Sequence, residues 1–503
     1  MVGDELYGPP RGVPRTIILS FETLACDAFL SIYAGYHVQM QSNGSFMHYL
    51  GHMLDRTRLD SPLHLAVKAT AVNMAVLLSR KTQEVSPDKY FAQATRSLRL
   101  TLNDEERSRD DDVLMAVLLL DFCDTISDHF RPLNTHDKRS HLLGAIALAE
   151  HRGQANYQNK ASQAMMVSMQ TGIVQNSLRS RKPLPSYYHH RFKNMRMPNT
   201  AVTRLNGLAQ RLTDILAGAK QLLGSQREAD KVLAFERDLL NLDNAYVRWY
   251  DTLPDLFRTN FVRGLEIPSC VRTMSAYQDT CTVNVDMSVA NMLNVWRQRR
   301  LILLHTLLNL NRTKALLGLS ERGSSIDISA TVQEIADGIC WSVGFFLGDF
   351  DQSVLPLLSR PLTFPYARTE TGTVPPSPKV HSDHATGSGP WLIILPLISL
   401  YLYATPRPGV LPVKVRDGQL AWVMRQLRRL QFDDRCRIGQ MLAAESGGVH
   451  LCMSLNGGDG RHSNCACTYL SMAEPSQSTL SSSQEMYESP LNDQFSKLFN
   501  NST

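Results

Sequence analysis

Apolar residues recur at helical spacing along most of this chain. The clearest case is residues 61–80, SPLHLAVKATAVNMAVLLSR, where Ser61 is a candidate N-cap and Pro62 fits the first helical position. From Leu63 onward the apolar positions follow the i, i+3, i+4, i+7 spacing of a helix with one buried face. Similar stretches begin near residues 16, 110, 137, 160, 201, 227, 288, 326 and 419.

Strand signals, by contrast, are nearly absent. Alternating apolar and polar runs do not recur, and no Asn-Gly turn lies between two such runs. No repeat of fixed period is present, which argues against a regular solenoid. We therefore predict an all-α fold, an irregular array of about a dozen helices.

Composition divides the chain into three parts. Residues 1–15 form a short lead, residues 16–448 a single helical domain, and residues 449–503 a tail rich in Ser, Gln and Asn. A tail of that composition cannot bury a core, so we predict that it is disordered. Within the domain, residues 356–390 are rich in Pro, Gly, Ser and Thr, which predicts a long surface loop.

The most apolar stretch, WLIILPLISLYLYA from Trp391 to Ala404, is interpreted as a buried helix. It is shorter than the roughly 20 residues that a membrane span needs, and Pro396 interrupts it. The first fifteen residues lack the apolar core of a signal peptide, and the nine cysteines are not arranged as a disulfide framework. We expect a soluble, intracellular chain without a membrane partner.

Three arginines lie in the helical stretch NVWRQRRLILLHTLLNL, residues 294–310. At 100° per residue, Arg300 falls on the apolar stripe, while Arg297 and Arg299 flank that stripe on opposite sides. A helix that reads DNA presents adjacent polar side chains on one exposed face, which this helix does not. We therefore predict a core helix in which Arg300 is buried with a partner and the two flanking arginines extend to solvent.

Several segments, in order, resemble the regulatory region of fungal zinc-cluster transcription factors. They are SPLHLAVKATA, HLLGAIALAEHRG with its Arg152-Gly153 pair, DNAYVRWYDTLP with Trp249 ahead of Pro254, the helix ending in LLHTLL, and GPWLIILPLISLY. The resemblance spans about Thr16 to Glu445. It implies a fungal regulator of transcription that acts in the nucleus.

Members of that family usually carry a six-cysteine, two-zinc module that reads DNA. This sequence departs from the pattern, because no Cys-x-x-Cys occurs in it and Cys26 lies in a helical stretch. A zinc cluster needs closely spaced thiolates. We therefore expect the chain to reach DNA only indirectly, either as a regulator without its own DNA reader or because an upstream module is missing.

Two groups of residues suggest a metal site but favour other interpretations. His450, Cys452, His462, Cys465 and Cys467 lie within eighteen residues, but their spacing matches no standard zinc finger. His381, Asp383 and His384 fall in the predicted loop and are interpreted as solvated. We assign no metal ligand and no cofactor.

The most basic stretch is LRSRKPLPSYYHHRFKNMR, from Leu178 to Arg196, with Tyr187, Tyr188 and Phe192 interleaved. It could contact phosphates or serve as a nuclear import signal, but we favour a solvated loop between two helices.

No catalytic residue is assigned, because the sequence contains no nucleophile elbow, phosphate-binding loop, His-Glu-x-x-His or dinucleotide fingerprint. The sequence therefore predicts a pathway-specific regulator, for example of a metabolic or secondary-metabolite gene cluster, rather than an enzyme. Expected partners are other transcription regulators or a homodimer partner, with a possible small-molecule effector. The alternatives are a helical scaffold without a transcriptional role and, less favoured, an α-helical enzyme.

Overall fold

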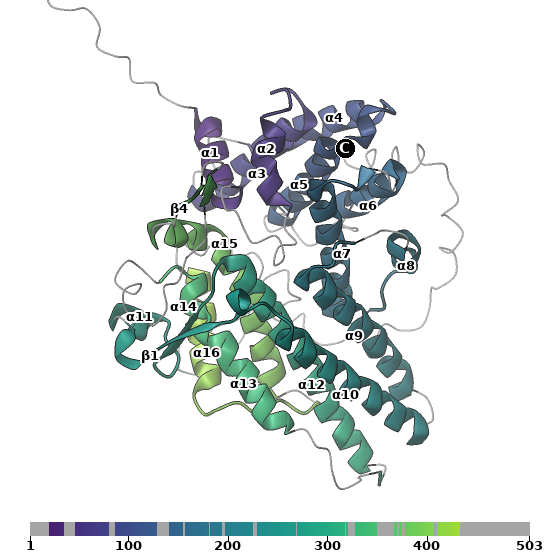
Figure 1. The fold of residues 1–503 in the computed structure, drawn as a ribbon, viewed down its shortest axis with the longest axis vertical. Helices are drawn as coiled ribbons and strands as arrows, with labels where there is room; N and C mark the ends of the chain where they lie inside the picture. Colours follow the sequence, from purple (N-terminus) through teal and green to yellow (C-terminus); the bar gives the residue numbers. More distant parts are fainter. Residues whose placement is uncertain are drawn as a thin grey trace, which may run out of the picture.

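A computed structural model gives the fold of this chain (Figure 1). It describes residues 20–34, 46–79, 86–127, 140–153, 156–180, 182–193, 197–224, 229–267, 269–316, 318–319, 327–349, 367–369, 372–374, 378–406 and 410–432. The predicted lead and tail lie outside these residues, as do Cys436 and the five His and Cys residues between 450 and 467.

Helices make up most of the described chain, which confirms the all-α prediction. The α-helices are α1 Phe21–Tyr33, α2 Leu50–Leu54, α3 Pro62–Ser79, α4 Pro87–Leu102, α5 Asp111–Ser127, α6 Ser140–Arg152, α7 Lys160–Ser180, α8 Ser186–Lys193, α9 Ala201–Gly224, α10 Ala229–Asp251, α11 Ser269–Met274, α12 Met287–Leu316, α13 Ile328–Trp341, α14 Val343–Phe346, α15 Pro378–Ala404 and α16 Gln419–Phe432. Short 3-10 turns are η1 Met47–Tyr49, η2 Arg107–Arg109, η4 Asp255–Phe257 and η5 Gly264–Glu266.

Local sequence explains where several of these helices begin. The Ser61 Oγ accepts a hydrogen bond from the His64 N–H at 3.3 Å, so Ser61 caps α3 as predicted. Asp286 caps α12 in the same way, accepting from the Val289 N–H at 2.7 Å, and Asp327 caps α13. A carboxylate at these positions also interacts favourably with the positive end of the helix dipole.

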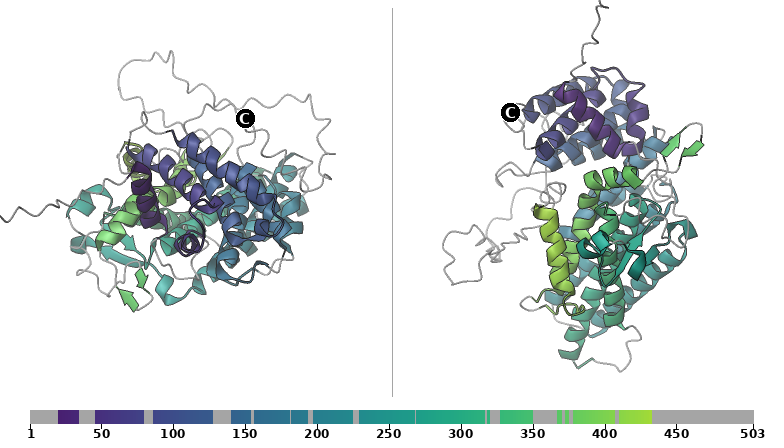
Figure 2. Two further views of the ribbon diagram at one scale, coloured as in Figure 1. Left: turned by 90° about the horizontal axis from the view of Figure 1, so that it is seen from above. Right: turned by 90° about the vertical axis from the view of Figure 1, so that its left-hand side faces the viewer.

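The helices form two groups (Figures 1 and 2). Helices α1 to α6 pack together at one end, with α3 against α1, α4 and α5. The other group contains α9, α10, α12, α13, α15 and α16. Helix α7 contacts α5 and α6 in the first group and α9 in the second, and α15 reaches α1. The ring of Phe122 on α5 lies 6.1 Å from that of Trp391 on α15, which closes the junction between the groups.

Helix α12 is the centre of the second group. It contacts α9, α10, α13 and α15, and Val289, Leu293, Leu303 and Leu304 are fully buried on it. Because other helices pack around α12 on most sides, few of its side chains reach solvent. This arrangement also buries its three central arginines.

Two short antiparallel ribbons interrupt the helices. Strand β1, Asn260–Arg263, pairs with β2, Thr280–Val283, and β3, Ala367–Thr369, pairs with β4, Gly372–Val374. Ahead of β2, Gln278 and Asp279 adopt left-handed conformations with φ of 49° and 51°. Because residues other than Gly, Asn and Asp seldom adopt this conformation, Gln278 offers no turn signal in the sequence.

The predicted loop over residues 356–390 is partly wrong. Strands β3 and β4 lie inside it, and α15 begins at Pro378, well before the expected boundary. The proline at the start of α15 is compatible with a helix, because proline is tolerated in the first helical turn. Gly389 does not mark a turn either, because close packing requires a residue without a side chain there. A Cβ on Gly389 would lie 1.6 Å from the Phe346 carbonyl oxygen. The stretch from Trp391 to Ala404 is helical and largely buried, as predicted. Within the described residues, none of the helices has the length and apolarity needed to cross a membrane.

Candidate functional site

The three arginines of α12 are all buried, at 8%, 3% and 8% exposure for Arg297, Arg299 and Arg300. The prediction for Arg300 is confirmed. The prediction that Arg297 and Arg299 extend to solvent is wrong, because α9 and α13 cover the flanks of the apolar stripe. Each guanidinium is therefore held by a different set of partners.

Arg300 forms a two-point ion pair with Asp243 of α10. Its Nε and Nη2 donate to the two carboxylate oxygens at 2.8 and 2.9 Å. The guanidinium also lies 5.3 Å from the ring centroid of Trp296, whose indole N–H donates to the Tyr246 carbonyl at 2.9 Å. These contacts join α12 to α10. They also compensate the charge of Arg300, which lies on the apolar stripe of α12.

Arg299 bonds to neutral oxygens of α9. It donates to the Leu205 carbonyl at 3.0 Å and to the Asn206 Oδ1 at 3.1 Å. Asn206 in turn donates to the Thr171 hydroxyl of α7 at 2.7 Å. Burial lowers the pKa of Arg299, since only neutral groups compensate its charge. This chain of contacts links α12, α9 and α7.

Arg297 makes one hydrogen bond among the described residues, from its Nη1 to the Asn294 Oδ1 at 2.7 Å. Asn294 donates onward to the Ser342 hydroxyl at 2.9 Å. The guanidinium passes over Gly338 of α13, where a Cβ would lie 2.6 Å from the Arg297 Nε. Burial lowers the pKa of Arg297 to about 10.

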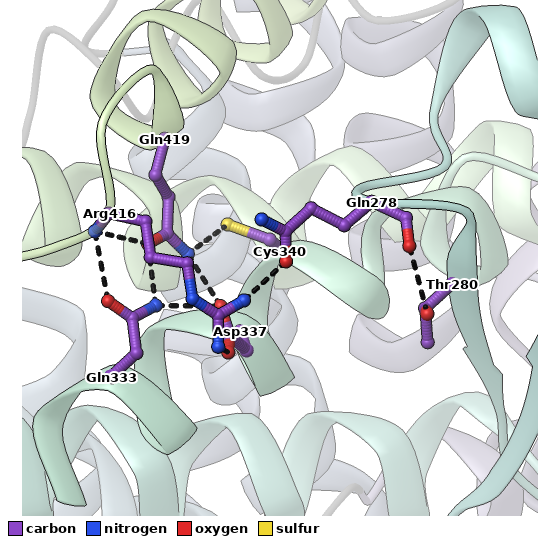
Figure 3. A network of polar contacts seen from close by, with 7 residues as sticks. All are labelled: Gln278, Thr280, Gln333, Asp337, Cys340, Arg416 and Gln419. Atoms are coloured by element: carbon purple, nitrogen blue, oxygen red, sulfur yellow. Dashed lines mark hydrogen bonds and ion pairs between the residues drawn. The ribbon is translucent and has the colours of Figure 1, made fainter. Parts of the chain in front are cut away.

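A second polar network joins α13 to the start of α16 (Figure 3). Asp337 is 3% exposed at its side chain and accepts from the Arg416 Nη2 at 2.7 Å. The amides of Gln333 and Gln419 donate to the same carboxylate at 2.7 and 3.1 Å. Arg416 also donates to the Gln278 Oε1 in the turn before β2. Two segments distant in sequence thus meet at one buried carboxylate, and the turn before β2 joins them through Arg416.

The pair Arg152-Gly153, singled out by the resemblance, ends α6. Arg152 is 3% exposed and donates to Asp111 at the start of α5, and Gly153 has a φ of 71° that favours glycine. Asn159 also donates to Asp111, at 2.6 Å. Trp249, from the segment DNAYVRWYDTLP that also carries the resemblance, donates to the Ala201 carbonyl at 2.9 Å. Both motifs therefore hold helices together.

The described residues offer little for metal binding or catalysis. No group of three His, Cys, Asp or Glu side chains among them is placed to hold a metal ion. His381 is fully buried on α15, with its Nε2 3.1 Å from the Phe345 carbonyl, so the interpretation of this residue as solvated is wrong. Burial raises the pKa of the Cys281 and Cys340 thiols to about 12, which keeps them protonated and poorly nucleophilic.

The basic stretch from Leu178 to Arg196 is not simply a loop. It includes the end of α7 and all of α8, and Tyr188 and Phe192 are buried with ring centroids 5.0 Å apart. Among its basic side chains the structure describes Lys182, which is exposed. Tyr188 and Phe192 thus serve packing, which their position among basic residues concealed.

A family model described as the fungal-specific transcription factor domain matches residues 29–340. Because the match covers more than half of the chain, the chain belongs to this family, as the resemblance implied. The class of protein is therefore a fungal transcriptional regulator. No curated protein and no solved structure matches the chain.

The family match ends at Cys340 in α13, but the packed structure continues beyond it. Gln298 of α12 donates to the Ser399 hydroxyl of α15 at 2.6 Å, and Arg429 of α16 forms a two-point pair with Asp349 at 2.8 and 2.6 Å. Helices α15 and α16 are thus packed onto the matched region.

Proposed function

We propose that this chain is a pathway-specific regulator of transcription that acts in the nucleus through its helical domain. In this proposal it controls a limited set of metabolic or secondary-metabolite genes. The observation that carries the proposal is the family match over residues 29–340. The polar residues of the two buried networks support it, because they join helices instead of forming a catalytic group.

The regulator works by binding rather than by chemistry. Its partners are other transcription regulators or a second copy of the chain, and its activity responds to a small-molecule effector. It reaches DNA indirectly, because α12 uses its three central arginines inside the fold. Groove reading requires side chains that are free to meet base edges.

The proposal is tested by comparing transcripts between a strain that lacks the gene and one that carries it. We expect coordinated changes in a limited set of genes, which return to normal when the gene is restored. A strain carrying the Arg300→Asp variant, which places a second carboxylate beside the buried Asp243 and so breaks the fold, should match the deletion. Transcript profiles that are indistinguishable with and without the gene would contradict the proposal.

Localisation separates this function from a scaffold without a transcriptional role. The tagged full chain, expressed at its natural level, should accumulate in the nucleus under the conditions in which the transcripts change. Exclusion from the nucleus under those conditions would favour the scaffold.

A further inference from the structure

Arg297 differs from its two neighbours on α12 in how little it is bonded. It is 8% exposed, yet its one hydrogen bond within the described residues goes to the neutral Asn294. A guanidinium carries five N–H donors, and a buried charge without a counter-charge is costly. Arg300 is paired with a carboxylate, and Arg299 donates to two neutral oxygens. Arg297 has a single acceptor among the described residues, so its burial is less compensated than that of its neighbours.

The setting of Arg297 is built to admit the guanidinium. It lies against Gly338, where any side chain would collide with its Nε, and Gly338 is in the last turn of α13. The C-terminal end of a helix carries partial negative charge, which offsets part of the cost while no ligand is present. The chain can therefore fold with Arg297 incompletely paired.

A buried donor without an acceptor lies one turn beyond Gly338 on α13. The indole N–H of Trp341 is buried and has no acceptor among the described residues. Residues three apart lie on the same face of a helix, so Trp341 lies on the side of α13 where Arg297 packs against Gly338. The ring of Phe261 contacts Trp341 edge-on, with centroids 5.7 Å apart, and Phe261 is 44% exposed. The aromatic end of this region thus reaches the surface.

We propose that Arg297 and Trp341 bind the effector of this regulator, a small molecule with a carboxylate on an apolar, aromatic body. A carboxylate accepts two parallel hydrogen bonds from a guanidinium, and the indole N–H supplies a further donor. Phe261 and the indole of Trp341 offer the apolar body a matching surface. The inference rests on the proposed regulatory function, because it names the ligand class to which that function responds.

Substitution without ligand provides the first test. Methionine matches much of the arginine stem without its charge, so Arg297→Met should melt no lower than the wild type. The same change at Arg300, which is paired with Asp243, should lower the melting temperature by several degrees, and exposed Arg312→Met on the same helix serves as the neutral control. If Arg297→Met melts well below the wild type or fails to fold, Arg297 is a structural residue and the proposal is wrong.

Binding to the purified full chain provides the second test. Sodium benzoate is the probe, benzamide is its uncharged counterpart, and sodium chloride matches the ionic strength. We expect benzoate to raise the melting temperature with saturation and benzamide to leave it unchanged. Arg297→Met should weaken benzoate binding at least tenfold, whereas Arg312→Met should not.

Equal effects of benzoate and benzamide, or equal benzoate binding by wild type and Arg297→Met, would overturn the effector site. This measurement uses isolated protein, so its failure leaves the transcript experiment standing. If the transcripts do not change but benzoate still binds, the proposed regulatory function is wrong and the anion site stands.

Discussion

Arg297, Arg299 and Arg300 lie within four residues of one helix, and each meets a different environment. The helix wheel identified the burial of Arg300, because it lies on the stripe of Leu303 and Leu304. It could not identify the burial of the other two, since the width of a buried surface depends on how many neighbours pack around the helix.

Replacement of Arg300 by alanine should destabilise the fold by about 2–4 kcal/mol, because it leaves the Asp243 carboxylate buried without its partner. Arg312→Ala, on the exposed side of α12, should change stability by less than about 0.5 kcal/mol. Urea denaturation followed by circular dichroism measures both. Equal stability of the two variants would show that the buried pair is not required.

Replacement of Gly389 by alanine should cost about 3 kcal/mol, because the added methyl would overlap the Phe346 carbonyl and force α15 away from α14. The matched control is Gly207→Ala on α9, where a Cβ would meet nothing within 4 Å. There, alanine should stabilise the helix by up to about 1 kcal/mol. Similar melting of the two variants would contradict the close helix contact.

At the level of elements, the sequence predicted best where one face of a helix is buried. The start of α3 at Ser61 and the burial of α15 followed from capping and apolar spacing. The start of α15 and the β1–β2 ribbon were missed because the residues involved make contacts with distant segments. In the sequence Gly389 reads as a helix breaker, but in the structure it allows α15 to pack against the Phe346 carbonyl. The turn at Gln278 and Asp279 makes its contact with Arg416, which is far away in the sequence.

The network that anchors α16 yields a prediction of unequal costs. Asp337→Ala should destabilise by about 3 kcal/mol, because it leaves the buried Gln419 amide and its neighbours short of an acceptor. Arg416→Ala should cost only about 1 kcal/mol, because the Arg416 side chain is 44% exposed and solvent screens its ion pair. Thermal unfolding of both variants provides the comparison. A larger loss for Arg416→Ala would mean that the surface arginine, not the buried carboxylate, organises the network.

At the scale of the whole molecule, family and fold class were both accessible from the sequence, because they depend on the order of motifs and on helical spacing along the chain. The buried networks were not, since Asp243, Asp337 and Asp111 find their partners across 57, 79 and 41 residues of sequence. Helical spacing predicts which face of a helix is buried, but it does not predict which residue of another helix packs against that face.

The isolated chain should show no sequence preference for duplex DNA. The missing Cys-x-x-Cys pattern and the buried arginines of α12 are the physical reasons. Binding of the purified chain to random and genomic fragments at physiological salt measures this directly. Preference for particular fragments by about a thousandfold or more, the low end for proteins that read DNA, would contradict it.

A tethering assay measures whether the folded helical domain regulates transcription. The full chain is fused to an unrelated DNA-reading module, and transcription of a reporter carrying that module's sites is measured in fungal cells. We expect a reproducible rise or fall relative to the module alone, which is lost at equal protein level in the Arg300→Asp variant, where two carboxylates would be buried together. Reporter output equal to that of the module alone, with the fusion folded and bound at its sites, would show that the domain does not regulate transcription.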